Sequence, residues 1–240
     1  AGNAGRGTVS AGNVSIGSSD VMIAGDYIGT NAQGTTALGN ALNGIDFFST
    51  SFSTIGGTAM GAGNVISGNG DQAAAGRNGI EFEDANTSNN LIAGNIIGLD
   101  ATGAAAVPNL RSGVVLFGGA TNNTIGGTVG AARNVLSGNT ESGVFIEGSQ
   151  TTTNYVLGNY IGTDATGASA FGNGLDGVTI DGAAQATIGG VAPEARNVIS
   201  GNARLGVALV DANGFGPAGL VAVLGNYIGT DASGSVALGN

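Results

Sequence analysis

The stretch RNVLSGNTESGVFI at 133–146 returns as RNVISGNARLGVAL at 196–209, about sixty residues later. A shorter signal, a glycine followed by a β-branched residue, recurs at Gly44-Ile45, Gly79-Ile80, Gly113-Val114, Gly143-Val144, Gly177-Val178 and Gly206-Val207. The intervals between these glycines are 35, 34, 30, 34 and 29 residues. A motif restored in phase at this spacing is typical of a solenoid, in which every unit is one coil stacked on the previous coil.

The coils are expected to consist of short strands. Val, Ile and Thr alternate with small polar residues at a period of two, as in GVFIE at 143–147, and Gly and Asn recur too often for a helix to propagate. One coil cannot bury its own apolar row, so neighbouring coils must supply the core. We therefore predict an all-β fold, a parallel β-helix (β-solenoid) of about seven coils of three short strands. At about 4.8 Å per coil, this single domain over 1–240 would be roughly 34 Å long.

One asparagine recurs at a fixed place in every coil. The column consists of Asn40, Asn69, Asn109, Asn139, Asn173, Asn202 and Asn240, and most members lie four residues before the glycine that opens the next coil. Stacked asparagines at one turn can bond their side-chain amides along the solenoid axis. We interpret this column as a structural ladder.

The coil text resembles a known family. Its opening GVxI, NTIGG at 123–127, RNVISGN at 196–202 and VLGNYIGTDATG at 156–167 are similar to the right-handed parallel β-helix repeat proteins of the pectin-lyase-like type, in particular long secreted bacterial members. The resemblance covers nearly the whole chain and implies right-handed coils. The family includes polysaccharide lyases, hydrolases, epimerases, adhesins and passive stalks, so the fold alone does not select a function. In its carbohydrate-active members, the outer face of a parallel sheet is a usual location for substrate.

Composition excludes several kinds of chemistry. The chain has no Cys, His or Trp, and all six of its cationic side chains are arginines, so it lacks a thiol nucleophile, an imidazole base and a Schiff-base lysine. The net charge of −10 argues against nucleic acid as a partner, whereas a hard cation such as Ca²⁺ would suit the carboxylates. No other cofactor is expected. No apolar stretch reaches the length of a membrane span, and we expect a secreted or cell-surface protein.

Outward strand positions gather carboxylates. In a strand written G-V-x-I-x, the Val and Ile face the core and the x positions face outward. Successive coils then put Asp46 beside Glu81 and Glu147 beside Asp181. The expected patch consists of Asp46, Glu81, Glu83, Asp84, Arg77 and Arg111, with Phe48 and Phe117 beside them.

Several roles are open for this patch. The catalytic candidates are Asp46, Glu81, Glu83, Arg77 and Arg111: a hydrolase would use two carboxylates, whereas a lyase would need an arginine as its base, for which the arginine pKa is poorly suited. Asp46, Glu81 and Glu83 are also the candidates for a Ca²⁺ site. The candidates for carbohydrate binding are Phe48, Phe117, Glu147 and Asp181. The competing interpretation is a solvated scaffold, with Arg111 beside Glu141 as a modest cross-strand pair.

Two further sets of charged residues recur. Asp100, Asp164 and Asp231 begin Asp-x-x-Gly loops, which we interpret as turns rather than Ca²⁺ sites because the aspartate can accept from the backbone two residues on. Arg133 and Arg196 precede the NVxSGN strands, and each is expected to form a salt bridge or to cap a carbonyl.

Two functions remain in competition. The leading hypothesis is an extracellular structural or adhesive rod without catalysis, because the repeat is regular and the chain begins and stops within it. Such a chain would be a segment of a longer array or a subunit that associates with itself end to end. The alternative is a module that binds or degrades a polysaccharide through the outward carboxylate and arginine patch.

Overall fold

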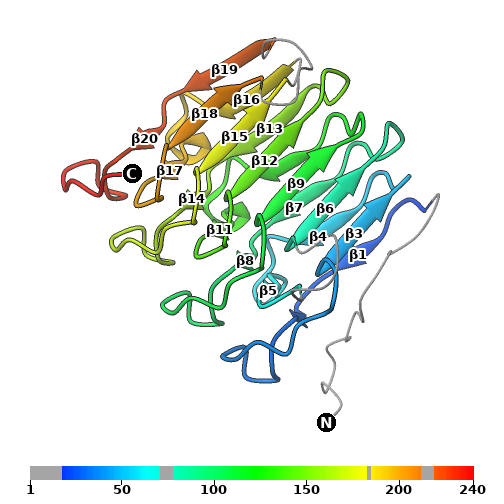
Figure 1. Cartoon of the computed structure of the whole chain (residues 1–240), viewed down its shortest axis with the longest axis horizontal. Coiled ribbons are helices and arrows are strands. Elements are labelled where there is room, and N and C mark those ends of the chain that lie inside the picture. Colours follow the sequence, from blue (N-terminus) through cyan, green and yellow to red (C-terminus); the bar gives the residue numbers. More distant parts are fainter. Residues whose placement is uncertain (1–17, 71–77, 183–184, 212–218) are drawn as a thin grey trace.

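Three parallel sheets, here named S1, S2 and S3, run along one rod, and each coil contributes a strand to each sheet (Figure 1). The computed structural model describes residues 18–70, 78–182, 185–211 and 219–240. Sheet S1 contains β3 (Ile45–Phe48), β6 (Ile80–Glu83), β9 (Val114–Phe117), β12 (Val144–Glu147), β15 (Val178–Asp181) and β18 (Val207–Val210). Sheet S2 contains β1 (Met22–Ile23), β4 (Thr54–Gly56), β7 (Leu91–Ala93), β10 (Thr124–Gly126), β13 (Asn154–Leu157), β16 (Gln185–Gly189) and β19 (Leu220–Leu224). Sheet S3 contains β2 (Tyr27–Ile28), β5 (Val65–Ile66), β8 (Ile96–Ile97), β11 (Val135–Leu136), β14 (Tyr160–Ile161), β17 (Val198–Ile199) and β20 (Tyr227–Ile228).

The predicted all-β parallel solenoid is confirmed. Two single-turn 3₁₀ helices, η1 (Gly130–Ala132) and η2 (Pro193–Ala195), interrupt the path from S2 to S3. S1 has six strands and S2 and S3 have seven, so the described chain makes about six coils rather than the expected seven. The expected start of the first coil, Asn13-Val14-Ser15-Ile16 in the sequence, lies outside the described residues, so this coil is represented only by β1 in S2 and β2 in S3. No helix in the described ranges is long and apolar enough to cross a bilayer.

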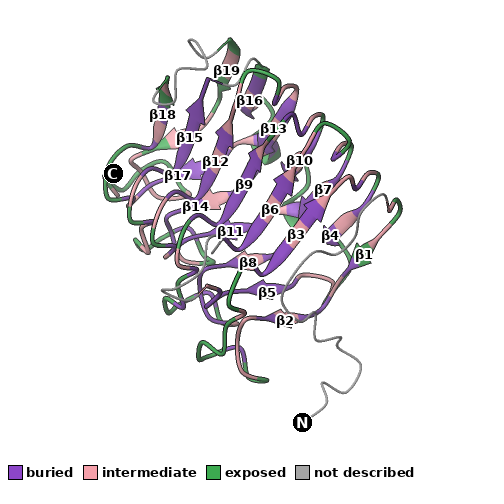
Figure 2. Cartoon of the chain, turned by 45° about the vertical axis from the view of Figure 1, so that its right-hand side comes forward, coloured by how far each residue is buried: buried purple, intermediate pink, exposed green. Residues whose placement is uncertain are grey.

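The core follows from the period-two pattern of the strands. Val144 pairs in register with Val114 on one side and Val178 on the other, so every coil points the same positions inward. These inward Val, Ile and Leu side chains are fully buried along the middle of the rod (Figure 2). Near the N-terminal end, Phe47 and Phe82 occupy the second inward column, which continues with Leu116 and Ile146. Their rings stack with centroids 5.0 Å apart. The apolar row of each coil is thus covered by its neighbours, as the repeat predicts.

Asparagine ladders occupy all three corners between the sheets. The predicted ladder, between S3 and S1, is confirmed: from Asn40 to Asn240 each side-chain Nδ2 donates to the Oδ1 of the next member at 2.8–3.0 Å. A second ladder between S2 and S3 links Asn64, Asn95, Asn134, Asn159, Asn197 and Asn226. A third, shorter ladder between S1 and S2 links Asn90, Asn123 and Asn154. In the sequence, the second column is the Asn that directly precedes β5, β8, β11, β14, β17 and β20, whereas Asp26 takes this place before β2.

The Asp-x-x-Gly loops are turns, as interpreted from the sequence. Asp100 Oδ1 accepts the backbone N–H groups of Ala104 and Ala105 at 3.0 and 3.1 Å. Burial raises the pKa of Asp100, but hydrogen bonds from Ala104, Thr102 and Ala105 outweigh it and lower the pKa below its ordinary value. The loops project from one side of the rod (Figure 1), and every second coil contributes one. Their carboxylates are therefore engaged in forming the turn.

The recurring arginines cap carbonyl groups, which was one of the two expectations for them. Arg133 Nε donates to the Gly158 carbonyl at 3.1 Å, and Arg196 Nε donates to the Gly225 carbonyl at 2.7 Å. Each guanidinium also lies over a tyrosine ring of the next coil, at 4.2 Å from Tyr160 and 4.1 Å from Tyr227. These contacts tie neighbouring coils together and leave the two arginines in structural roles.

Candidate functional site

The outer face of S1 carries the outward columns in the predicted register. Asp46 lies opposite Glu81, and Phe48 lies opposite Glu83. Glu147 likewise lies opposite Asp181 on β12 and β15. Parallel strands lie about 4.8 Å apart, so these side chains are direct neighbours along the rod.

Three of these carboxylates form a cluster, here named the acidic triad: Asp46, Glu81 and Glu83. One oxygen atom of each lies within 4.8 Å of the others. Carboxylate oxygens at this spacing are the ligands that a hard cation such as Ca²⁺ takes, so these are the residues that could hold a metal. Asp84, predicted in the same patch, instead forms a turn: it accepts from Ser49 Oγ at 2.5 Å and from the Asn86 backbone N–H at 2.8 Å.

Burial raises the pKa of two carboxyl groups of the acidic triad. Burial, with added repulsion from Glu81 and Glu83, raises the pKa of Asp46 to about 6. Burial also raises the pKa of Glu81, opposed by a hydrogen bond from Asn78. Asp46 Oδ1 is buried and accepts no hydrogen bond from the described residues. Asp46 therefore takes up a proton at a higher pH than an ordinary aspartate, and the repulsion among the ionised carboxylates favours a bound cation.

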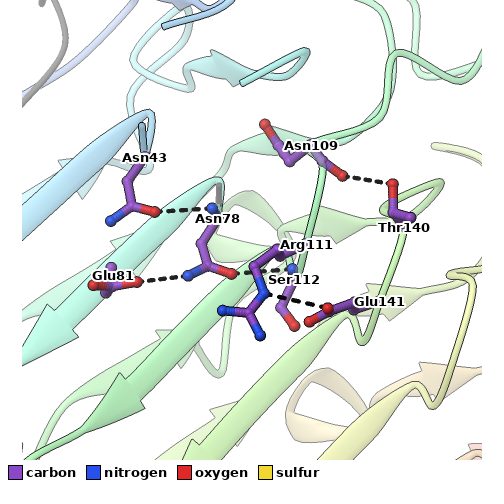
Figure 3. A network of polar contacts seen from close by, with 8 residues as sticks. All are labelled: Asn43, Asn78, Glu81, Asn109, Arg111, Ser112, Thr140 and Glu141. Carbon is purple, nitrogen blue, oxygen red and sulfur yellow. Dashed lines mark hydrogen bonds and ion pairs between the residues drawn. The ribbon is translucent and has the colours of Figure 1, made fainter. Parts of the chain in front are cut away.

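A polar row at the start of the S1 strands positions Glu81 (Figure 3). Asn78 Nδ2 donates to Glu81 Oε2 at 2.5 Å, and Asn78 Oδ1 accepts the Ser112 backbone N–H at 3.1 Å. The Asn78 backbone N–H in turn donates to Asn43 Oδ1 at 2.9 Å. Asn78 is itself held by the coils before and after it, and it therefore keeps the Glu81 carboxylate in place next to Asp46.

A groove of about 590 Å³, here named the S1 groove, extends from the acidic triad toward the C-terminal coils. Its floor consists of outward residues from successive strands, chiefly Val115, Phe117, Phe145 and Thr179. It runs from β6 to β18, which are four coil steps or roughly 19 Å apart. A smaller hollow of about 330 Å³ continues past Phe117 over the turn at 148–151. The groove is long, open and partly aromatic.

The wall of the S1 groove consists of charged and hydroxyl side chains from the turns that precede the S1 strands. Arg111 Nε contacts Glu141 Oε1 at 3.2 Å, the pair expected from the sequence (Figure 3). Thr179 Oγ1 donates to Asp176 Oδ2 at 3.1 Å and lies 3.0 Å from Ser142 Oγ. Buried hydroxyl and carboxylate groups therefore face the same open space as the two phenylalanine rings.

The groove differs from the expected patch in position. Glu81, Arg111, Phe117, Glu147 and Asp181 line it, as the sequence allowed. Asp46, Glu83 and Phe48 do not line it, and the expectation for Arg77 falls outside the described residues.

Four further residues that were not expected at the site also line the groove: Phe145, Asp176, Thr179 and Arg204. Phe145 and Thr179 occupy the same outward column as Asp46, so the signal was present. Asp176 is buried just before β15, and the repeat pattern of the sequence does not mark this position as facing a groove.

Comparison with known proteins yields no match among family models, curated proteins or solved structures.

Proposed function

We propose that this β-solenoid binds a carbohydrate chain lengthwise in the S1 groove. The observation that carries the proposal is the groove itself: about 590 Å³ of open space on the outer face of a sheet, with Phe117 and Phe145 in its floor. Sugar rings present apolar C–H faces to aromatic side chains, while their hydroxyl groups need hydrogen-bond partners. Arginine side chains of the groove wall supply donors next to the rings, and the neighbouring carboxylates supply acceptors.

The family resemblance of the coil text supports the same face, because carbohydrate-active pectin-lyase-like proteins use the outside of a parallel sheet. It also supports a secreted or cell-surface setting of the bacterial type, where polysaccharides are abundant. Binding is the proposal; cleavage is a separate outcome that the same assay would detect.

The test is a panel of neutral, acidic and basic oligosaccharides, with binding measured by calorimetry and products by chromatography. Phe145→Ala and Phe117→Ala should each weaken binding at least about fivefold, since an aromatic contact contributes about 1 kcal/mol. Phe52→Ala is the matched control, because Phe52 is 63% exposed and lies outside the groove. No binding by the wild-type chain, or equal losses in all three variants, would refute the proposal.

A Ca²⁺ ion in the acidic triad is an accompanying proposal. It is supported by the three converging carboxylates and by the buried Oδ1 of Asp46. Calorimetric titration with Ca²⁺ should show one site that the combined Asp46→Asn and Glu81→Gln variant lacks. An unchanged titration in that variant would place any bound Ca²⁺ elsewhere.

Self-association of the rod is a second candidate function, favoured by the C-terminal coil. Its inward residues Leu209, Val223 and Ile228 are 50%, 40% and 45% exposed, although the corresponding residues of the preceding coil are fully buried (Figure 2). Such a face suits a further coil stacked on it, supplied either by a second copy of the chain or by continuation of the repeat, the arrangement of a structural or adhesive rod. Sedimentation should then show concentration-dependent assembly that Ile228→Asp abolishes. A monomer at all concentrations would contradict this candidate.

A further inference from the structure

We infer that the S1 groove selects a glycan carrying free amino groups over neutral and acidic glycans. This inference rests on the proposed function, because it names the class of carbohydrate that the groove binds. Among the residues that line the groove, five are carboxylates and two are arginines, which leaves a formal charge of −3: Glu81, Glu141, Glu147, Asp176 and Asp181 against Arg111 and Arg204.

Both arginines already face carboxylates of the groove wall. Arg111 Nε lies 3.2 Å from Glu141 Oε1, and an Arg204 terminal nitrogen lies 3.9 Å from Asp176 Oδ2. Each guanidinium is therefore offset by an acidic neighbour at the rim. An acidic sugar would have to compete with these neighbours, and it would also approach the remaining carboxylates of the floor.

The floor places acidic groups next to aromatic groups along the rod. In one outward column, Glu83 pairs with Phe117, and the next two coils contribute Glu147 and Asp181. A sugar ring that packs on Phe117 or Phe145 would place the substituents of the next sugar about one coil step, or 4.8 Å, away beside these carboxylates. An ammonium group at that place gains a charge-assisted hydrogen bond in a partly buried setting.

Carboxylates next to the groove add to its negative charge. The acidic triad adjoins the groove through Glu81 and adds two further carboxylates at its N-terminal end. A groove with a net negative charge concentrates cationic ligands and raises their association rate. The aromatic floor distinguishes the inferred ligand from a simple polycation, because packing on the phenylalanine rings requires an apolar C–H face in addition to positive charge.

The experiment compares matched oligomers by calorimetry at about pH 6.5, where most amino groups are protonated and Asp46 is largely ionised, in buffer with a chelator. The ligands are an oligomer of glucosamine, its N-acetylated counterpart with the same backbone, an oligogalacturonate and an oligolysine of similar charge. We expect the glucosamine oligomer to bind about tenfold more tightly than the N-acetylated form, and added salt to reduce that preference. Tightest binding of oligolysine would overturn the inference in favour of a basic peptide.

Two variants separate charge from shape. Glu147→Gln removes one floor carboxylate with little change in volume, and it should weaken binding of the amino form more than binding of the N-acetylated form, which reduces the preference between them. Asp181→Asn tests the next position in the same way. Glu194→Gln is the matched control, because Glu194 is exposed on η2 and does not line the groove. An unchanged preference in both floor variants would overturn the inference.

The results also distinguish failure of the inference from failure of the proposed function. Equal or tighter binding of the N-acetylated or acidic oligomer would overturn the inference and leave the proposed carbohydrate-binding function standing. Absence of binding by every saccharide would remove both.

Discussion

Asn134 provides a quantitative test of the asparagine ladders. It is fully buried in the corner between S2 and S3. Its Oδ1 accepts the backbone N–H and the Nδ2 of Asn95 at 2.9 and 3.0 Å. Its Nδ2 donates to the Ile92 carbonyl at 2.8 Å and to Asn159 Oδ1 at 3.0 Å. One side chain therefore connects three consecutive coils.

Replacing Asn134 by Ala removes all four hydrogen bonds. At about 1 kcal/mol net for each bond, the free energy of unfolding should fall by about 4 kcal/mol. The largest part comes from the Asn95 backbone N–H, which is left without an acceptor in a buried corner. Because each coil contacts only its neighbours, the loss should be greatest in β8, β11 and β14.

The assay is urea unfolding combined with amide hydrogen exchange, which locates the destabilised coils. Asn86→Ala is the control, because Asn86 is exposed and belongs to no ladder; its effect should stay within about 0.5 kcal/mol. Asn134→Asp keeps the shape but turns oxygen atoms toward the Ile92 carbonyl and Asn159 Oδ1. Burial should raise the pKa of the new carboxyl, so its destabilisation should be smallest at low pH. If Asn134→Ala costs no more than Asn86→Ala, the ladder does not stabilise the rod and the reasoning is refuted.

Two further predictions concern the acidic triad and the coil corners. The folded-state pKa of Asp46, about 6, lies above the value of about 3.9 for an unfolded aspartate, so its stabilising contribution is complete below about pH 4 and is lost as the pH rises through 6. Asp46→Asn should therefore be more stable than the wild type above pH 6, with the difference shrinking toward pH 4 in urea unfolding; a difference independent of pH would contradict this. Gly126→Ala should lower the free energy of unfolding by about 2–4 kcal/mol, since Gly126 has a φ of +92° and a Cβ would lie 1.9 Å from the Leu157 carbonyl oxygen. Gly130→Ala is its control, with no atom within 4 Å of the added Cβ, and equal midpoints for the two variants would contradict the steric argument.

The candidate site was predictable from the sequence to a limited extent. The register of the repeat placed Asp46 beside Glu81 and Glu147 beside Asp181, and both neighbours are confirmed. The repeat also supplied the outward column to which Phe145 belongs. It did not show where along the rod the outer face is hollowed, because that depends on how the turns before the S1 strands project beside the sheet. The centre of the site consequently lies closer to the C-terminal coils than the patch expected around Asp46.

The sequence by itself determined the solenoid, the parallel register and the ladder from Asn40 to Asn240. These are periodic properties, and a motif that returns in phase contains the coil length and the inward positions directly. Only the tertiary structure decided which outward side chains converge on one space, which carboxylates acquire a raised pKa and which arginines are committed to caps. Those properties depend on burial and on distances of a few ångströms between residues about thirty positions apart in the chain, and a one-dimensional pattern does not contain them.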